Sequence, residues 1–254
     1  MATAKKSTEV ATQQPAGLVF AQEAPDYIKQ GAGRGSEEVK ASDMVLPRLE
    51  IVQSQSPIKE TDDTIRDGQL FNSVTQENLG DMVYFVPVYY RMEWLVWKDA
   101  DKGGGFFGSH SNEADARARV IEEVENGENE EDLEIVDTPV QYGLLVNPTT
   151  GTAEQIVMSM AKTKAKVSRK WNAMISIAGG DRFSRVYKVS SFRDENKKGQ
   201  KFFNYVVQPA GFTPKAIYEQ AEKIYEILKT QDFRVAHESA APEKDAGSSD
   251  RGDI

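Results

Sequence analysis

The most informative stretch of the chain covers residues 81–98, DMVYFVPVYYRMEWLVWK, and predicts one long aromatic β-strand. Side chains alternate between the two faces of a strand. The even positions, which include Tyr90 and Trp94, are apolar throughout and predict the face toward the core. Pro87 cannot donate a ladder hydrogen bond, so we expect a bulge or a sheet edge there, and a bulge would swap the two faces beyond it. The odd face, which we expect to be exposed, carries Tyr89, Arg91 and Trp97.

Shorter strands and three helices are predicted around this strand. Alternation and turn residues place strands at 47–53, 68–74, 140–146, 154–160, 182–192 and 201–208. Helical spacing and stop signals place helices at 112–126, 165–177 and 213–230. Ala114, Ala118, Ile121 and Val124 form the apolar side of the first helix, and Thr213 is the expected N-cap of the last. The glycine-rich segment 103–108, GGGFFG, lacks the lysine of a phosphate-binding loop and predicts a flexible hairpin tip.

These elements predict a mainly β (α+β) fold, namely a small OB-like barrel with appended helices and disordered N- and C-terminal tails. Residues 1–42 are small and polar and predict a flexible arm. Residues 43–232 would form the OB-like nucleic-acid-binding domain, with an acidic insertion around 112–137. Residues 233–254 predict an acidic, disordered tail.

The composition excludes several classes of protein. The chain has 254 residues, no cysteine and two histidines, which excludes disulfides and thiolate metal sites and disfavours a histidine-based triad. Most carboxylates lie in polar segments, where they cannot be tuned for acid–base chemistry, so we expect a non-enzymatic protein without metal or cofactor. There is no apolar run of about eighteen residues and no secretory leader pattern, which predicts a cytoplasmic protein without membrane contact.

The net charge of −9 hides a strong asymmetry. Residues 155–205 hold twelve cations and three acids, which gives +9 and leaves −18 for the rest of the chain. Such a distribution indicates an anion-binding surface on an acidic protein, although a solvated basic face balanced by an acidic loop gives the same pattern.

The basic segment and the aromatic strand together predict a surface for single-stranded nucleic acid, because unpaired bases stack on aromatic rings while cations follow the phosphates. The predicted helix start near Lys164 would also offer free backbone N–H groups to a phosphate. Alternatively, this helix docks on the acidic segment of the same chain. The predicted nucleic-acid-binding residues are Tyr89, Arg91, Trp97, Lys162, Lys164, Lys166, Arg169, Lys170, Trp171, Arg185, Lys188, Lys201 and Phe202.

Five strings resemble a group of phage-encoded single-stranded DNA-binding proteins of the OB-fold type. They are LPRLEIVQSQSP (46–57), GQLFNSV (68–74), VPVYYRMEWLVW (86–97), GGGFFG (103–108) and VSRKWN (167–172). The ending DRGDI is similar to the acidic tails of replication single-strand binders. The resemblance implies that Asp250, Asp253 and Ile254 recruit replication or recombination proteins and compete with DNA for the basic groove.

The expected function is therefore sequence-independent binding of single-stranded DNA in phage replication or recombination, in the host cytoplasm. Two alternatives remain at this point. One is a virion structural or assembly protein without DNA affinity, and the other is a strand-annealing recombination protein that forms rings or filaments.

Overall fold

The computed structural model describes residues 34–39, 45–60, 62–195 and 199–230. The chain divides into two units, Met1–Lys40 and Ala41–Ile254, and the strands and helices described below belong to the second. The predicted tail 233–254, with Asp250, Asp253 and Ile254, lies outside the described residues, as does most of the predicted arm 1–42.

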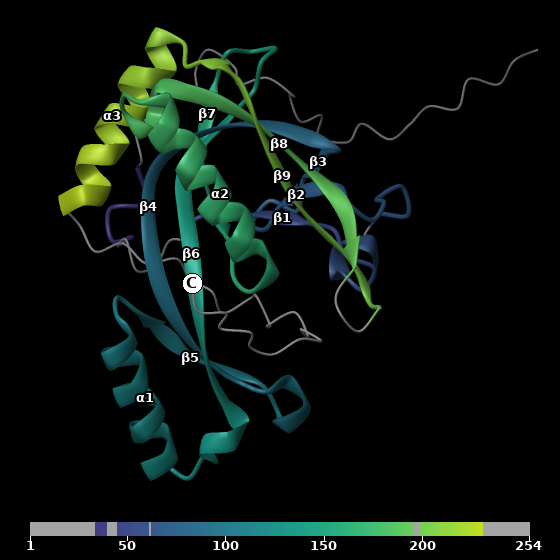
Figure 1. Cartoon of the computed structure of the whole chain (residues 1–254), viewed down its shortest axis with the longest axis vertical. Helices are drawn as coiled ribbons and strands as arrows, with labels where there is room; N and C mark the ends of the chain where they lie inside the picture. Colours follow the sequence, from purple (N-terminus) through teal and green to yellow (C-terminus); the bar gives the residue numbers. More distant parts are fainter. Residues whose placement is uncertain (1–33, 40–44, 61, 196–198, 231–254) are drawn as a thin grey trace, which may run out of the picture. The chain divides into compact units, whose positions relative to one another are not determined.

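Two antiparallel sheets form the described part of the second unit (Figure 1). The larger sheet has the order β7-β6-β4-β8-β9, with β5 paired to β4. Its strands are β4 (Met82–Lys98), β5 (Gly105–His110), β6 (Leu133–Val146), β7 (Ala153–Ser159), β8 (Arg185–Glu195) and β9 (Lys201–Phe212). The smaller sheet contains β1 (Leu49–Ile51), β2 (Leu70–Asn72) and β3 (Asn78–Gly80).

Three α-helices and four short 3-10 helices complete these described elements. The α-helices are α1 (Glu113–Glu125), α2 (Thr163–Ala178) and α3 (Lys215–Thr230). The 3-10 helices are η2 (Pro57–Glu60), η3 (Ala100–Lys102), η4 (Glu130–Asp132) and η5 (Arg182–Ser184). The predicted α+β class is confirmed, whereas both sheets are open, so the structure does not confirm an OB-like barrel.

Most of the predicted elements are found, and two strands are new. The turn at Asn147 joins β6 to β7 as expected, with the backbone N–H of Gly151 donating to the carbonyl of Asn147 at 2.9 Å. The sequence analysis missed β3 and β5 and the first half of β6. β5 contains most of the glycine-rich segment, because only its first glycines serve the turn after η3 and the following FFGSH pairs with β4. The predicted cap of α3 is absent, since Thr213 Oγ1 has no partner among the described residues.

A bulge at Val88 decides which side chains of β4 face which layer. Pro87 pairs with Gly143 and Tyr89 pairs with Tyr142, so Val88 is the extra residue. Before the bulge the odd residues Val83 and Phe85 are buried, and the even residue Met82 is exposed. The prediction of an even core face is confirmed for Val86, Val88 and Val96 and wrong for Met82, because odd residues are buried as well and both faces of the strand are covered. The bulge expected near Pro87 is present.

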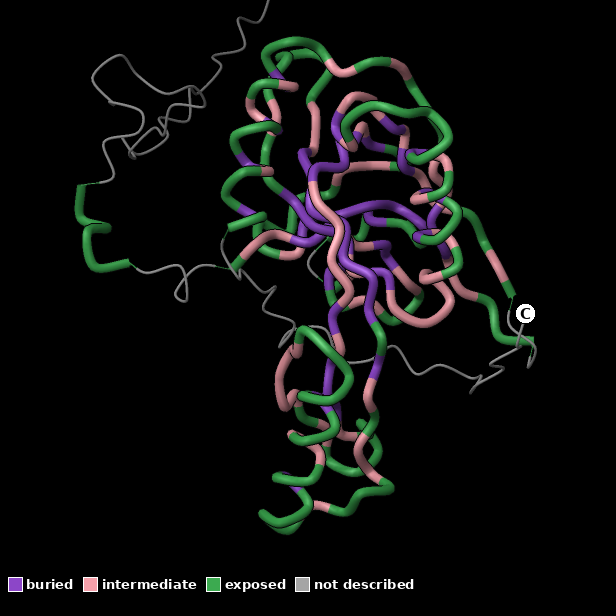
Figure 2. Tube along the Cα trace, turned by 60° about the vertical axis from the view of Figure 1, so that its left-hand side comes forward, coloured by how far each residue is buried: buried purple, intermediate pink, exposed green. Residues whose placement is uncertain are grey.

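Each face of the larger sheet carries its own apolar core. On one face Trp171 and Ile175 of α2 pack with Phe85 and with residues of β7, β8 and the smaller sheet. On the other face Ile217 and Ile224 of α3 pack with residues that include Val86 of β4. Figure 2 shows the buried residues following the strands between these layers. The sheet is thus sandwiched between α2 and α3.

The long β4–β6 ribbon continues beyond the part covered by α2 and α3, and there it carries β5 and α1 (Figure 1). Trp97 is buried in this region at 5 % exposure, with its ring 4.7 Å from that of Phe106. The exposure predicted for Trp97 is wrong, because β5, unforeseen in the sequence, covers its side of the ribbon.

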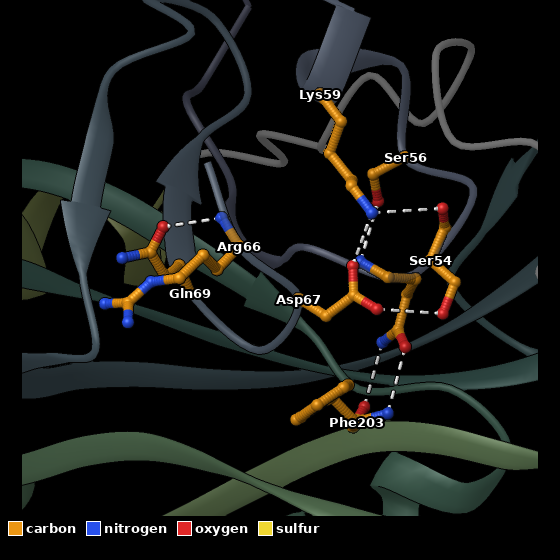
Figure 3. A network of polar contacts seen from close by, with 8 residues as sticks. Ser54, Ser56, Lys59, Arg66, Asp67, Gln69 and Phe203 are labelled. Atoms are coloured by element: carbon orange, nitrogen blue, oxygen red, sulfur yellow. Dashed lines mark hydrogen bonds and ion pairs between the residues drawn. The ribbon is translucent and has the colours of Figure 1, made fainter. Parts of the chain in front are cut away.

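The smaller sheet is joined to β9 by polar contacts of one loop (Figure 3). The side-chain amide of Gln53 donates to the Phe203 carbonyl at 2.9 Å and accepts from the Phe203 N–H at 2.9 Å. Lys59 Nζ lies 2.7 Å from Asp67 Oδ1, and its hydrogen bond lowers the pKa of that carboxyl. Because these contacts tie the loop ends to each other and to β9, the smaller sheet is fixed against the face that carries α2.

Replacement of Trp171 tests the core between α2 and the sheet. The ring is 0 % exposed and lies 5.4 Å from that of Phe85 and 5.5 Å from that of Tyr187. We expect Trp171→Ala to lower the free energy of unfolding by about 3–5 kcal/mol, measured by urea unfolding followed by circular dichroism. Ile177→Ala, in the same helix but at a side chain that is 86 % exposed, should change it by less than about 0.5 kcal/mol. Equal effects of the two changes would contradict this core.

Candidate nucleic-acid interface

The outward side of α2 carries three exposed cations. Trp171 and Ile175 hold the helix on the sheet, so Lys166, Arg169 and Lys170 point away from it and are exposed. None of the three has a carboxylate partner within the described ranges. Like charges three and four residues apart on a helix repel each other, so this arrangement costs stability unless an anion binds there.

The first turn of α2 differs from the expectation. Lys162 has a positive φ of 52° and its Nζ lies 3.3 Å from Glu134 Oε2, which is the contact with the acidic segment foreseen as an alternative. Lys164 lies over the ring of Tyr205, with Nζ 5.9 Å from the centroid. The N–H groups of Lys164 and Ala165 donate to the carbonyls of Ala161 and Lys162, so the free N–H groups expected there are already bonded.

A half-buried arginine adjoins the exposed cations. The Arg182 guanidinium donates to Asn172 Oδ1 at 2.7 Å and to Gln141 Oε1, and it lies 5.5 Å from the ring centroid of Tyr90. Burial lowers the pKa of Arg182 to about 10, and no carboxylate contacts it among the residues the structure describes. Within the described residues, the neighbours of its positive charge are therefore neutral amides and an aromatic ring.

Tyr90 connects this arginine to the face of α2. The ring is half-buried, and burial raises the pKa of its hydroxyl, while the charges of Arg182 and Arg169 act in the opposite direction. Gln141, directly opposite Tyr90 on β6, donates to Ser168 of α2 at 2.9 Å. Tyr90, Arg182 and the three exposed cations of α2 are called the α2 surface below.

Tyr89 and Arg91 lie on the other side of the sheet. The ring of Tyr89 is 6.4 Å from that of Tyr142 and 6.2 Å from that of Tyr225 in α3. Arg91 donates to the carbonyl of Leu228 at 3.3 Å. The structure therefore corrects the expected exposed platform, because the bulge turns these residues toward α3 and packs them there.

The two tryptophans predicted to bind bases are both core residues. Trp97 lies beneath Phe106, and Trp171 lies between Phe85 and Tyr187. Their rings are covered on the sides that a base would need, so neither forms a stacking surface. Large aromatic side chains fill these cores because they bury more apolar area than any other residue.

The remaining predicted residues are spread over the sheet. Arg185 lies 4.5 Å from the ring centroid of Phe212, which is 75 % exposed. Lys188 is opposite Tyr84 and alternates with Tyr187, so it is on the face away from α2. Lys201 and Phe202 lie at the β8–β9 hairpin, where Lys201 is exposed and Phe202 half-buried. These residues do not form one surface with α2.

Sequence reasoning missed Tyr90 and Arg182. Parity counted from residue 82 placed Tyr90 in the core, although Pro87 signalled the bulge that moves it beside α2. Counting parity afresh after Pro87 would have found Tyr90. For Arg182 no sequence signal exists, because its role depends on the contact of η5 with Asn172 and Gln141.

Neither a metal site nor a membrane-spanning helix is found in the part of the chain that the structure describes. No group of three histidine, cysteine, aspartate or glutamate residues there could hold a metal ion. Likewise, none of its helices has the length and apolar character needed to cross a membrane.

Comparison with known proteins identifies the family of the chain. No curated protein and no solved structure matches it. A family profile described as "Pam3 phage gp34-like protein" matches residues 14–234, which include β1 to β9 and all three α-helices. The chain therefore belongs to the family of Pam3 phage gp34-like proteins.

Proposed function

We propose that this phage-family protein binds single-stranded DNA without sequence preference, in replication or recombination in the host cytoplasm. The observation that carries the proposal is the set of exposed cations Lys166, Arg169 and Lys170, which have no carboxylate partner within the described ranges. An anionic polymer supplies the negative charge that the chain itself does not place there.

The placement of the other cations strengthens this argument. The protein has 40 acidic residues against 31 basic ones, so acidic partners are abundant. Three cations elsewhere form such pairs: Lys59 lies 2.7 Å from Asp67, Lys98 lies 2.5 Å from Glu128, and Arg117 lies 2.6 Å from Glu113. The cations of α2 differ in that this helix contains no acidic residue at all, whereas the lysines of α3 alternate with glutamates, so α2 indicates a surface for an external anion.

Tyr90 favours a single strand over a duplex. A half-buried ring beside Arg182 and Arg169 offers a π-face to a base while the cations hold the neighbouring phosphates. The bases of a duplex are stacked on each other and cannot use such a ring. In this proposal the curved sheet is the platform for the DNA, in place of the OB-like barrel implied by the sequence resemblance. Asp250, Asp253 and Ile254 recruit partner proteins.

Removal of the three cations tests the phosphate contacts. For Lys166→Gln/Arg169→Gln/Lys170→Gln we expect weaker binding to oligo-dT and a salt slope smaller by about 2, because each phosphate contact with a single strand contributes about 0.7. The measurement is a fluorescence titration of the full chain at several salt concentrations.

The matched control is Lys215→Gln/Lys223→Gln/Lys229→Gln, which removes three exposed cations from α3 on the opposite face of the sheet. It should leave the salt slope nearly unchanged. A flat salt response of the wild type, or equal affinity for duplex and single strand, would contradict the proposal. If the protein binds neither single-stranded nor duplex DNA, the alternative role in virion assembly would be favoured instead.

Replacement of Tyr90 tests the stacking. We expect Tyr90→Ala to weaken binding by about 1–3 kcal/mol, or roughly 5- to 150-fold, because the ring is lost. Tyr90→Phe should stay close to the wild type. Tyr84→Ala removes a half-buried tyrosine from the opposite face of the same strand and should have little effect. An unchanged Kd of a folded Tyr90→Ala protein would show that Tyr90 does not contact the bases.

A further inference from the structure

Helix α1 exposes its apolar side. Ala114, Ala118, Ile121 and Val124, whose spacing predicted this helix, are all exposed, with Ile121 at 61 % and Val124 at 38 %. The opposite side of the helix is buried instead, through Ala116 and Glu123. Surface helices normally bury their apolar side, whereas this side of α1 has no partner among the described residues.

Polar contacts explain why α1 is oriented in this way. The Arg119 guanidinium donates to the carbonyl of Phe107 at 3.2 Å and pairs with Glu123, which fixes this side of the helix on β5. Nη1 of Arg119 lies 2.7 Å from Oε2 of Glu122. The exposed apolar stripe is therefore bordered by the carboxylates of Glu122 and Glu125, and neither α2 nor α3 packs against it.

Helix α2 exposes a side with the same spacing and the opposite charge. Exposed residues Lys166, Lys170, Ala173 and Ile177 lie at intervals of four, three and four. Exposed residues Ala114, Ala118, Ile121 and Glu125 of α1 lie at the same intervals. In both helices this spacing keeps the four residues on one side. Each stripe has an apolar end and a charged end, basic in α2 and acidic in α1.

We propose that α1 of one protein molecule packs antiparallel on α2 of a second copy. In this register Ala114 meets Ile177 and Glu125 meets Lys166. The contact of Ala118 with Ala173 lets the two helices approach closely, and the long stem of Lys170 covers Ile121. The antiparallel arrangement also places the helix dipoles favourably.

The occupant is a second copy because the chain carries both halves of the contact on different elements. α1 packs on β4, β5 and β6, whereas α2 covers the sheet between β6 and β9. Both stripes remain exposed within one molecule. A contact between two different surfaces is heterologous, so it produces a ring or an open filament rather than a closed symmetric dimer.

Two arginine substitutions at the centre of the contact test this arrangement. Ala118→Arg and Ala173→Arg each put a large cation where the two helices touch, and both positions are exposed in the single molecule. In sedimentation velocity without nucleic acid, we expect the wild type to self-associate with rising concentration. Each variant alone should remain at the 28.3 kDa of one chain.

Mixing the two variants distinguishes a heterologous contact from other modes of association. The Ala118→Arg chain keeps a working α2 stripe and the Ala173→Arg chain keeps a working α1 stripe. An equimolar mixture should therefore form a species with twice the mass of one chain and grow no further. Ala216→Arg, an exposed alanine in α3, is the matched control and should associate like the wild type. Circular dichroism checks that every variant is folded.

Three results would overturn the proposal. The first is a wild-type chain that stays monomeric up to a concentration on the order of 1 mM. The second is an Ala118→Arg or Ala173→Arg variant that associates like the wild type. The third is a mixture of the two variants that remains monomeric. This contact covers Lys166 and Lys170, so a second copy and DNA would compete for the α2 surface. All three results are measured without DNA, so they do not depend on whether the proposed DNA binding is found.

Discussion

The extra residue Val88 in β4 is the constraint on which the arrangement of the described layers depends. Without it, the odd-numbered positions, which face α2 at the start of the strand, would face α2 along the whole strand. With it, Phe85 faces Trp171 of α2, while Tyr89 faces Tyr225 of α3. One residue thus allows a single strand to supply aromatic side chains to both cores of the sheet, and it leaves Tyr90 beside Arg182.

Local patterns were sufficient to predict most of the elements, although not β3 and β5, and tertiary contacts were needed to orient them. Alternation found β4, and the apolar spacing of Ile217 and Ile224 found the buried side of α3. The apolar spacing of α1 does not reveal which side of it is buried, because Arg119 holds the other side of the helix on β5. Trp97 was predicted to be exposed for a related reason, since β5 was not foreseen.

In the candidate site, too, some residues could be identified from the sequence and others only from the fold. The cations of α2 could be found from the charge distribution, because they lie in one segment. Arg182 could not, because its neighbours Gln141 and Asn172 come from β6 and α2. Among the described residues this half-buried guanidinium contacts two amides and the Tyr90 ring and no carboxylate, so its positive charge is not cancelled locally. The positive field of the α2 surface therefore has a half-buried source as well as exposed ones.

The continuous pairing of β4 with β6 has a consequence for how this family can vary in length. Every ladder pair from Tyr84–Val146 to Lys98–Leu133 brings the outgoing and returning chain within about 5 Å of each other. A short turn can close the ribbon at any such pair, so relatives can shorten, extend or replace residues 99–132, including β5, without rebuilding the strands from β6 to β9. Loss of this segment would cost stability at Trp97, because its ring would no longer be covered by Phe106. An aromatic residue at that position should therefore accompany the presence of the inserted segment.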